Sequence, residues 1–232
     1  MASTEPSCPL DRCLGNLLDH DNDSQYAIYP AAEAVPTTEA KTLADVLSQH
    51  TACALTRVQR YAIALTLASS HLQYHATPWL QSAWTAEEVY FPITSGLTAT
   101  DTRLLHGQPY ILTSFEDQPS NTSASKDASF TALGIVLLEL CFGKPLDSHP
   151  LLQQPGFSQS KTNPMVRQFI ATQWLDEAAG EAGEQYANAA RWCLQQAPAN
   201  VTDEKWRSDF AQNVVWPLQQ CYESMQPRQT TQ

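Results

Sequence analysis

The sequence feature that most constrains the fold is an apolar run from Phe130 to Leu146. Residues 133–142 are apolar on every side of a helical wheel, and the only acid among them is Glu139. Such a helix must be enclosed by other helices or by lipid. The run has about half of the ~20 apolar residues that cross a bilayer, so it predicts the central buried helix of a water-soluble domain. Gly143 and Pro145 are expected to end it.

The charge of the chain excludes two classes of partner. The 232 residues include 13 Lys and Arg against 24 Asp and Glu, which gives a formal net charge of −11. The basic residues are scattered, whereas nucleic acids and anionic membrane surfaces are bound by clustered Lys and Arg. We therefore expect no nucleic-acid partner and no membrane insertion.

The cysteines and histidines give no metal-binding pattern. The six cysteines, at positions 8, 13, 53, 141, 193 and 221, form no Cys-x-x-Cys pair and no zinc-type spacing with histidine. No apolar secretory segment follows Met1, so a cytoplasmic protein with reduced cysteines is expected. His71 and His75 share one helical face but lack the intervening Glu of the zinc-protease motif. We expect a His pair that is either hydrogen-bonded or solvent-facing, no metal and no cofactor.

Helical periodicity dominates the remainder of the chain. Thr42 followed by Asp45 is a capping-box pattern that predicts a short helix over 42–49. A longer helix is expected over 56–75, with an inward set of apolar residues at helical spacing. That set consists of Val58, Tyr61, Ala62, Leu65 and Leu72.

Further helices are expected over 165–177, 184–196 and 203–225, with Pro217 kinking or dividing the last one. The inward residues of the first of these are predicted to be Val166, Phe169, Ile170 and Trp174. Polar loops are expected over 118–127 and 147–163, and a break over 178–183.

The β-like segments are few and short. They cover residues 25–31, 88–91 and 110–115, and residues 1–23 show leucine spacing typical of a short amphipathic helix. The pattern predicts a mainly α fold with a vestigial β element. Within a single domain of residues 1–232 we expect an extension over 1–40, a helical core over 41–225 and a tail over 226–232.

Several of these motifs resemble the C-terminal lobe of a protein kinase. Gly134 is followed five residues later by Glu139-Leu140 and then by Gly143-x-Pro145, as in the central helix of that lobe. Residues 190–194, followed by Trp206-Arg207, are similar to its penultimate helix. The resemblance implies a degenerate kinase-like C-terminal lobe. It also implies that Glu139 forms a buried ion pair, for which Arg207 is the expected partner.

The residues that perform phosphoryl transfer in a kinase do not occur at the corresponding positions. Aligned from His75 onward, the catalytic base becomes Ala83, the loop Lys becomes Thr85 and the magnesium-binding Asn becomes Glu88. No glycine-rich phosphate loop precedes residue 56. Phosphoryl transfer depends on a positioned nucleophile and on charge neutralisation through magnesium, so no phosphotransferase activity is expected.

A more specific resemblance is to a fungal family of uncharacterised kinase-like domains. The shared motifs are Ala64-Leu65-Thr66-Leu67-Ala68-Ser69-Ser70, His75-x-Thr77-Pro78-Trp79-Leu80, Trp84, Leu133-Gly134-Ile135, Leu138-Glu139-Leu140-Cys141-Phe142-Gly143 and Arg191-Trp192-Cys193-Leu194. This resemblance covers residues 40–225.

Two interpretations of the region after the long helix remain open. Trp79 and Trp84 either fill the space of the missing catalytic loop or, with Tyr110, line an apolar ligand pocket. In the pocket interpretation the polar contacts and any catalysis come from Asp101, Arg103 or His106.

The functional prediction follows the first interpretation. We expect a non-catalytic, kinase-derived interaction or regulatory module that binds a protein partner. The alternative is a cofactor-free enzyme of fungal secondary metabolism, such as a cyclase, isomerase or pericyclase. Such an enzyme would hold a small apolar molecule in a reactive shape. The oligomeric state stays open.

Overall fold

The computed structural model describes two units, Met1–Thr37 and Thr38–Gln232. The described residues are 15–19, 24–28, 39–48, 55–75, 77, 80, 84–95, 102–104, 109–111, 124–158, 162–196 and 205–226. The first unit contains a β-hairpin, and the second contains a small antiparallel sheet and a large helical core.

The hairpin of the first unit replaces the helix that the leucine spacing predicts. Strand β1 (Gly15–Asp19) pairs antiparallel with β2 (Ser24–Ile28), with Gly15 opposite Ile28 and Asp19 opposite Ser24. The expected strand at residue 25 is confirmed over most of its length, and the expected helix is wrong for residues 15–19. Pairing with β2 satisfies backbone groups of β1, and the spacing of leucines within one segment does not reveal such a partner.

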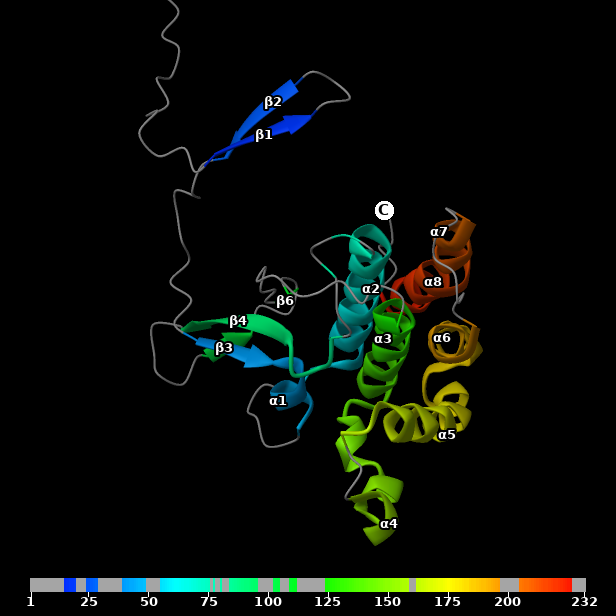
Figure 1. Ribbon diagram of the computed structural model, residues 1–232. Coiled ribbons are helices and arrows are strands. Elements are labelled where there is room, and N and C mark those ends of the chain that lie inside the picture. Colours follow the sequence, from blue (N-terminus) through cyan, green and yellow to red (C-terminus); the bar gives the residue numbers. More distant parts are fainter. Residues whose placement is uncertain are drawn as a thin grey trace, which may run out of the picture. The chain divides into compact units, whose positions relative to one another are not determined.

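The second unit is mainly α-helical, which confirms the mainly α part of the predicted fold class (Figure 1). Its helical elements are α1 (Leu43–Leu47), α2 (Arg57–Tyr74), α3 (Ala124–Phe142), η2 (Leu146–Ser148), η3 (Pro150–Gln153), α4 (Pro155–Ser158), α5 (Pro164–Ala182), α6 (Glu184–Arg191), η4 (Trp192–Gln196), α7 (Lys205–Phe210), η5 (Ala211–Val215) and α8 (Trp216–Met225). Elements η2 and η3 are 3₁₀ turns, whereas η4 and η5 are π turns.

A small antiparallel sheet accompanies the helices. Strand β4 (Val89–Ser95) pairs with β3 (Glu39–Thr42), β5 (Thr102–Leu104) and β6 (Tyr110–Ile111). The strands expected near residues 88 and 110 are confirmed in β4 and in the first two residues of the second segment. Residues 112–115 lie outside the described part of the chain.

The capping box predicted at Thr42 is confirmed, and a second one occurs at the start of α2. The Thr42 side chain accepts a hydrogen bond from the Asp45 N–H, and Asp45 accepts one from the Thr42 N–H. Thr56 and Gln59 form the same reciprocal box at the start of α2. Each box satisfies N–H groups that a helix leaves without an internal partner.

The prediction of the inward face of α2 is wrong, because the buried face is rotated about the helix axis from the predicted one. Val58 is exposed, and Leu65 and Leu72 are only half-buried. The buried face consists of Tyr61, Ile63, Ala64, Leu67, Ala68 and His71. Apolar residues occupy more than one stripe of this helix, so its packing against α3 and α8 decides which stripe is enclosed.

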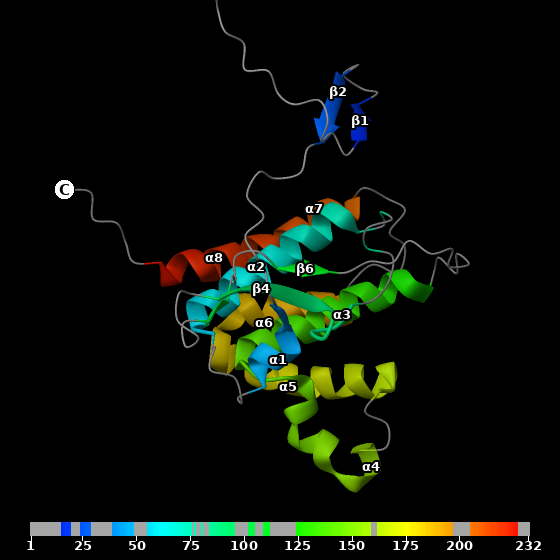
Figure 2. The ribbon, with the colours of Figure 1, turned by 90° about the vertical axis from the view of Figure 1, so that its left-hand side faces the viewer.

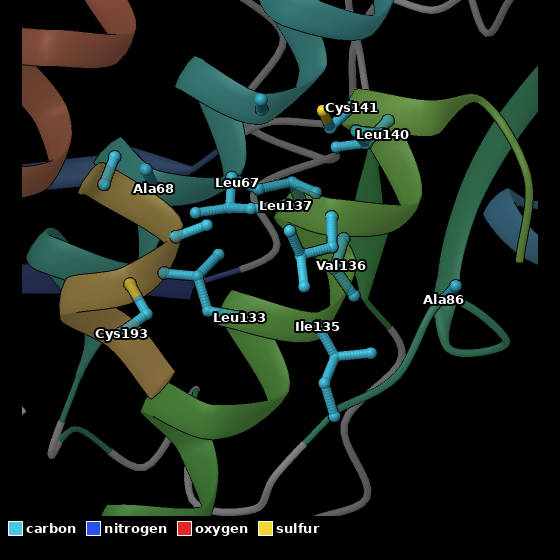
Figure 3. Close-up of a cluster of buried hydrophobic side chains, with 14 of the residues drawn as sticks. Leu67, Ala68, Ala86, Leu133, Ile135, Val136, Leu137, Leu140, Cys141 and Cys193 are labelled. Atoms are coloured by element: carbon cyan, nitrogen blue, oxygen red, sulfur yellow. The ribbon is translucent and has the colours of Figure 1, made fainter. Parts of the chain in front are cut away.

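Helix α3 is the centre of the core, as the apolar run predicts. Every residue from Ser129 to Cys141 except the partly exposed Thr131 is buried, and the helix contacts α2, α5, α6 and η4. Figures 1 and 2 both show α3 running between α2 on one side and α5 and α6 on the other. In Figure 3, Leu133 and Leu137 point toward Leu67 of α2 and Cys193 of η4.

Three contacts fix the ends and neighbours of α3. Gly143 has φ +66°, and the Lys144 N–H bonds to the Glu139 carbonyl, which closes the helix in a Schellman-type turn. Arg60 of α2 donates to the Cys141 carbonyl at 3.1 Å. The buried Tyr186 hydroxyl of α6 donates to the Leu137 carbonyl at 2.8 Å.

Helix α3 and η4 approach each other closely at Gly134. A Cβ atom at this position would lie 2.7 Å from Leu194 Cγ and 3.1 Å from Cys193 Cβ. Side chains in a dense core cannot yield by that much without strain. Gly134 therefore permits α3 and η4 to pack against each other.

We expect Gly134→Leu to destabilise the protein by about 1–3 kcal/mol through overpacking. Gly180→Ala is the matched control, because Gly180 is also within a helix but has no atom within 4 Å of a built Cβ. The control is expected to gain about 1 kcal/mol from helix propensity. Denaturant unfolding of both variants measures the difference, and equal responses would show that α3 is not closely packed at Gly134.

Several loop and break predictions need correction. The loop expected over 118–127 ends earlier, because α3 already begins at Ala124. The loop expected over 147–163 contains η2, η3 and α4. The break expected over 178–183 is confined to Gly183, whose φ of +86° only glycine adopts readily. Small alanines before it are good helix formers, so α5 continues through Ala182.

The last helix divides near Pro217, as predicted. Helix α7 passes into the π turn η5, and α8 begins at Trp216 with Pro217 in its first turn. Proline has no N–H to donate to the preceding turn and its ring crowds the carbonyl there. A π turn widens the backbone at that point without ending the helical path.

Candidate functional site

The residues proposed from sequence as a ligand pocket have different environments. Trp79, Asp101 and His106 lie outside the described residues, as do Ala83 and its two predecessors. Arg103 lies in β5 opposite Thr94 of β4, and its side chain is not described. Trp84 and Tyr110 are described and are treated in turn.

Trp84 belongs to the hydrophobic core. Its side chain is 3% exposed and packs in the same buried cluster as the core residues of α1, β4 and α3. The indole N–H has no hydrogen-bond partner among the described residues. The environment of the ring is that of a packing residue.

Tyr110 lies on the outside of the small sheet. Its ring is 39% exposed and stacks on Tyr90, with ring centroids 5.6 Å apart and planes at 22°. The two residues are cross-strand partners in the β4–β6 pair. This stacking is ordinary cross-strand stabilisation of a sheet.

The His pair, expected to be hydrogen-bonded or solvent-facing, is buried inside an aromatic cluster. His71 and His75 have ring centroids 4.9 Å apart, and both contact the ring of Phe130. His71 also stacks on Phe210, and His75 contacts Trp206 edge to face. The cluster thus joins α2, α3 and α7 through ring contacts.

His71 is neutral in this environment. The side chain is 1% exposed, and neither ring nitrogen has a hydrogen-bond partner among the described residues. Burial, with a smaller contribution from the neighbouring His75, lowers the pKa of His71 to about 3. No group of three or more metal-binding side chains occurs in the described part of the chain, so the pair has no described third ligand.

Glu139 is the acid that most resembles a functional carboxylate. It is 3% exposed, and its Oε1 accepts a hydrogen bond of 2.8 Å from the Leu146 N–H. Arg167 Nη2 lies 4.0 Å from the same oxygen, but Arg167 Nη1 donates to Asp147 at 2.6 Å. Oε2 has no hydrogen-bond partner among the described residues.

The predicted Glu139–Arg207 ion pair is wrong. Arg207 is exposed and lies over the ring of the adjacent Trp206. The basic residue near Glu139 is instead Arg167 of α5, three residues after the start of that helix. The order of helices in the sequence does not show which of them crosses the end of α3.

Burial dominates the protonation of Glu139. Desolvation raises the pKa of this carboxyl to about 7, although the Leu146 hydrogen bond and Arg167 act in the opposite direction. Asp147 and Glu87 add to the rise through their negative charges. The side chain therefore ties the end of α3 to η2 in a largely uncharged form below neutral pH.

The raised pKa of Glu139 predicts a pH-dependent stability. The unfolded chain releases this proton near pH 4.5 and the folded chain near 7, so the stabilising contribution is complete below pH 4.5 and is lost as the pH rises through 7. Glu139→Gln keeps an acceptor for Leu146 and removes the titration. We expect the variant to gain about 2 kcal/mol relative to the parent between pH 5.5 and pH 8.5.

Urea unfolding of the parent and Glu139→Gln at the two pH values measures that gain. Asp147→Asn is the matched control, because Asp147 is exposed and pairs with the same arginine. A difference between parent and Glu139→Gln that stays constant with pH would contradict the assignment.

A groove of about 290 Å³ lies elsewhere, between α2, α6 and α8. Its lining residues are Tyr61, Ala182, Gly183, Glu184, Gln185, Cys221, Ser224 and Met225. The Tyr61 hydroxyl accepts hydrogen bonds from Arg57, and Arg57 also donates to the Glu181 carbonyl. The Tyr61 hydroxyl in this groove thus already has a hydrogen-bond partner on its own helix.

The sequence pattern did not predict the exposed apolar surface on α5. Met165 is 80% exposed and Phe169, predicted to be inward, is 51% exposed. Phe157 of α4 stacks on Phe169, with ring centroids 6.3 Å apart. Trp174, one of the two predicted inward residues that are confirmed, stacks on Phe142 with ring centroids 4.5 Å apart. The apolar residues of α5 cover more than one face, and only Ile170 and Trp174 of the expected set are buried.

The second unit is a mainly α-helical domain. Its described residues Glu139 and His71, whose pKa values are strongly shifted, are buried in the core. No described helix has both the length and the apolar character needed to cross a membrane. The chain belongs to the family described as domain of unknown function DUF7580, whose model matches residues 13–223. No curated protein and no solved structure matches the chain.

Proposed function

We propose that the chain is a non-catalytic protein-interaction module derived from a kinase-like C-terminal lobe. The observation that carries this proposal is the open apolar pair Met165 and Phe169 on α5. Exposed apolar groups that neighbour one another are typical of surfaces that bind other proteins. Glu139 and His71, whose pKa values are shifted, are buried in the core and are therefore not accessible to a substrate.

The order of elements supports the kinase-derived part of the proposal. A long helix, α2, precedes a short strand, β4, and both precede the buried central helix α3. The resemblance assigns these places to the helix before the catalytic loop, the strand after it and the central helix of the lobe. The fungal origin belongs to the same proposal and rests on the resemblance alone.

We expect no binding of ATP with magnesium. Glu88, at the position of a magnesium-binding Asn, accepts hydrogen bonds from the N–H and the hydroxyl of Thr85, so its carboxylate is held within its own turn. Calorimetric titration with ATP and magnesium measures the affinity. Micromolar binding would contradict the non-catalytic proposal, and ADP without magnesium serves as the control for unspecific nucleotide binding.

Site-specific photo-crosslinking tests the interaction function directly. A photoreactive residue is placed at Gln73, Gln173 or Gln212, which are exposed residues of α2, α5 and η5. The labelled chains are irradiated in extract from cells that produce the protein. We expect at least one position to give a protein adduct that excess unlabelled chain suppresses. Absence of a suppressible adduct at all three positions would contradict an interaction function.

A further inference from the structure

We propose that the exposed face of α5 is the docking surface for a basic amphipathic helix of a partner protein. This inference rests on the proposed interaction function and names the surface and the chemistry of the partner. The surface, called the α5 stripe, consists of Met165, Phe169, Thr172, Asp176 and Gly180.

The α5 stripe has the spacing of a helix–helix contact. Its residues are separated by 4, 3, 4 and 4 positions, which places them on one side of a helix. The opposite side of α5 holds Ile170, Ala171, Trp174, Leu175 and Ala178, all buried in the core. Helix α5 therefore buries one apolar side in the core, and it also carries large apolar side chains on its exposed side.

The N-terminal part of the stripe supplies the apolar anchors. Met165 and Phe169 are one turn apart and are 80% and 51% exposed. Phe157 of α4 extends this surface through its stacking on Phe169, and Figure 2 shows α4 below the N-terminal end of α5. Exposed Met and Phe side chains that adjoin each other are typical anchors for the apolar face of a partner helix.

The C-terminal part of the stripe is small and acidic. Thr172 donates its hydroxyl to the Gln168 carbonyl, so its polar group is used within the helix. Gly180 has open space where a Cβ would be, which allows a partner backbone to approach. Asp176, with Glu177 and Glu181 beside it, is exposed.

Charge selects the partner. The helix α5 carries three acidic residues and one basic residue, Arg167, which points inward to Asp147 and Glu139. Asp176 is seven residues from Phe169, which corresponds to about 10 Å along the helix. A partner that places Lys or Arg two turns from an apolar pair complements both parts of the stripe.

A second copy of this chain fits the stripe poorly. If two copies of α5 packed against each other, parallel or antiparallel, Asp176 of one copy would face acidic or apolar residues of the other. In addition, each chain has a formal charge of −11, so two copies repel each other. Anionic lipid is disfavoured for the same reason, because acidic surfaces are repelled by negative membranes. The basic helix is the occupant that the charges favour.

The probe is a synthetic helical peptide of about 18 residues, long enough to span the stripe. It carries two Leu residues one turn apart with Lys residues two turns away on both sides, so that either direction of binding is accommodated. Comparison peptides replace Lys by Glu or Leu by Ser. Fluorescence anisotropy measures the affinity of each peptide for the full chain at low and high salt.

We expect the Lys peptide to bind at least tenfold more tightly than the Glu and Ser peptides at low salt. Phe169→Ser is expected to weaken binding at least tenfold, since a large apolar anchor is lost. Asp176→Lys should reverse the preference between the Lys and Glu peptides. Trp216→Ser is the matched control, because Trp216 is 59% exposed on α8 and lies outside the stripe.

Other outcomes overturn the inference. Equal binding of the Lys and Glu peptides, or unchanged binding by Phe169→Ser, would remove the stripe as the docking surface. A dimer in analytical ultracentrifugation that Phe169→Ser dissolves would make a second copy the occupant. Phe169-dependent binding to vesicles of phosphatidylserine and phosphatidylcholine would make lipid the occupant.

Failure of this inference is distinguishable from failure of the proposed function. Suppressible crosslinks at Gln73 or Gln212 without peptide binding to the stripe would overturn the docking surface and leave the interaction function in place. Absence of crosslinks at every position would contradict the function itself.

Discussion

A Trp84→Ala variant is expected to lose about 3–5 kcal/mol of unfolding free energy, because removal of a buried Trp leaves a void that the core cannot close. The side chain is 3% exposed within the main hydrophobic cluster. In a chain of this size the loss corresponds to a fall in melting temperature of roughly 10 °C. Differential scanning calorimetry measures it.

Two further variants make the Trp84 result specific. Trp216→Ala removes the same side chain from an exposed position and is expected to change stability by less than about 0.5 kcal/mol. Trp84→Phe keeps most of the ring volume and removes an indole N–H that has no described partner, so its cost should be much smaller.

The Trp84 measurement also separates the two functional classes. A melting curve of Trp84→Ala that overlays the parent would mean that the ring borders an open cavity. That result would favour the cofactor-free enzyme over the interaction module, because a substrate-sized apolar pocket would then adjoin residue 84.

His71 is expected to make the protein sensitive to acid. The unfolded chain binds a proton at this group below about pH 6.5, whereas the folded chain does so only near pH 3. The unfolded state therefore binds more protons between these values, and stability falls as the pH decreases through this window. The slope for one such group is about 1.4 kcal/mol per pH unit.

His71→Phe removes this titration and keeps an aromatic ring beside Phe130 and Phe210. We expect the variant to gain about 2 kcal/mol relative to the parent between pH 7 and pH 5. Urea unfolding at both pH values measures the gain, and His71→Leu repeats the test with a smaller side chain. A pH-independent difference from the parent for both variants would contradict a neutral, buried His71.

In the parent protein, the effects of the two titrations on stability are expected to offset each other. Between pH 4.5 and 6.5 the buried His71 favours folding more as the pH rises, and the buried Glu139 favours it less. The two contributions oppose each other, so the parent shows a flatter profile than either variant. His71→Phe and Glu139→Gln should therefore deviate in opposite directions as the pH rises.

The sequence by itself determined the parts of this protein that depend on local pattern. The apolar run around Glu139 identified the central helix because a helix that is apolar on every side must be enclosed, and this run is too short to cross a bilayer. The capping box at Thr42 and the division at Pro217 followed from backbone hydrogen bonds that act within a few residues.

Only the tertiary structure decided which faces and partners those helices use. The apolar residues of α2 and α5 cover more than one stripe, so packing against α3 placed Val58 and Phe169 outside and His71 inside. The same packing brought Arg167 rather than Arg207 to Glu139. These choices depend on contacts between residues far apart in the chain, and periodicity within one helix carries no information about them.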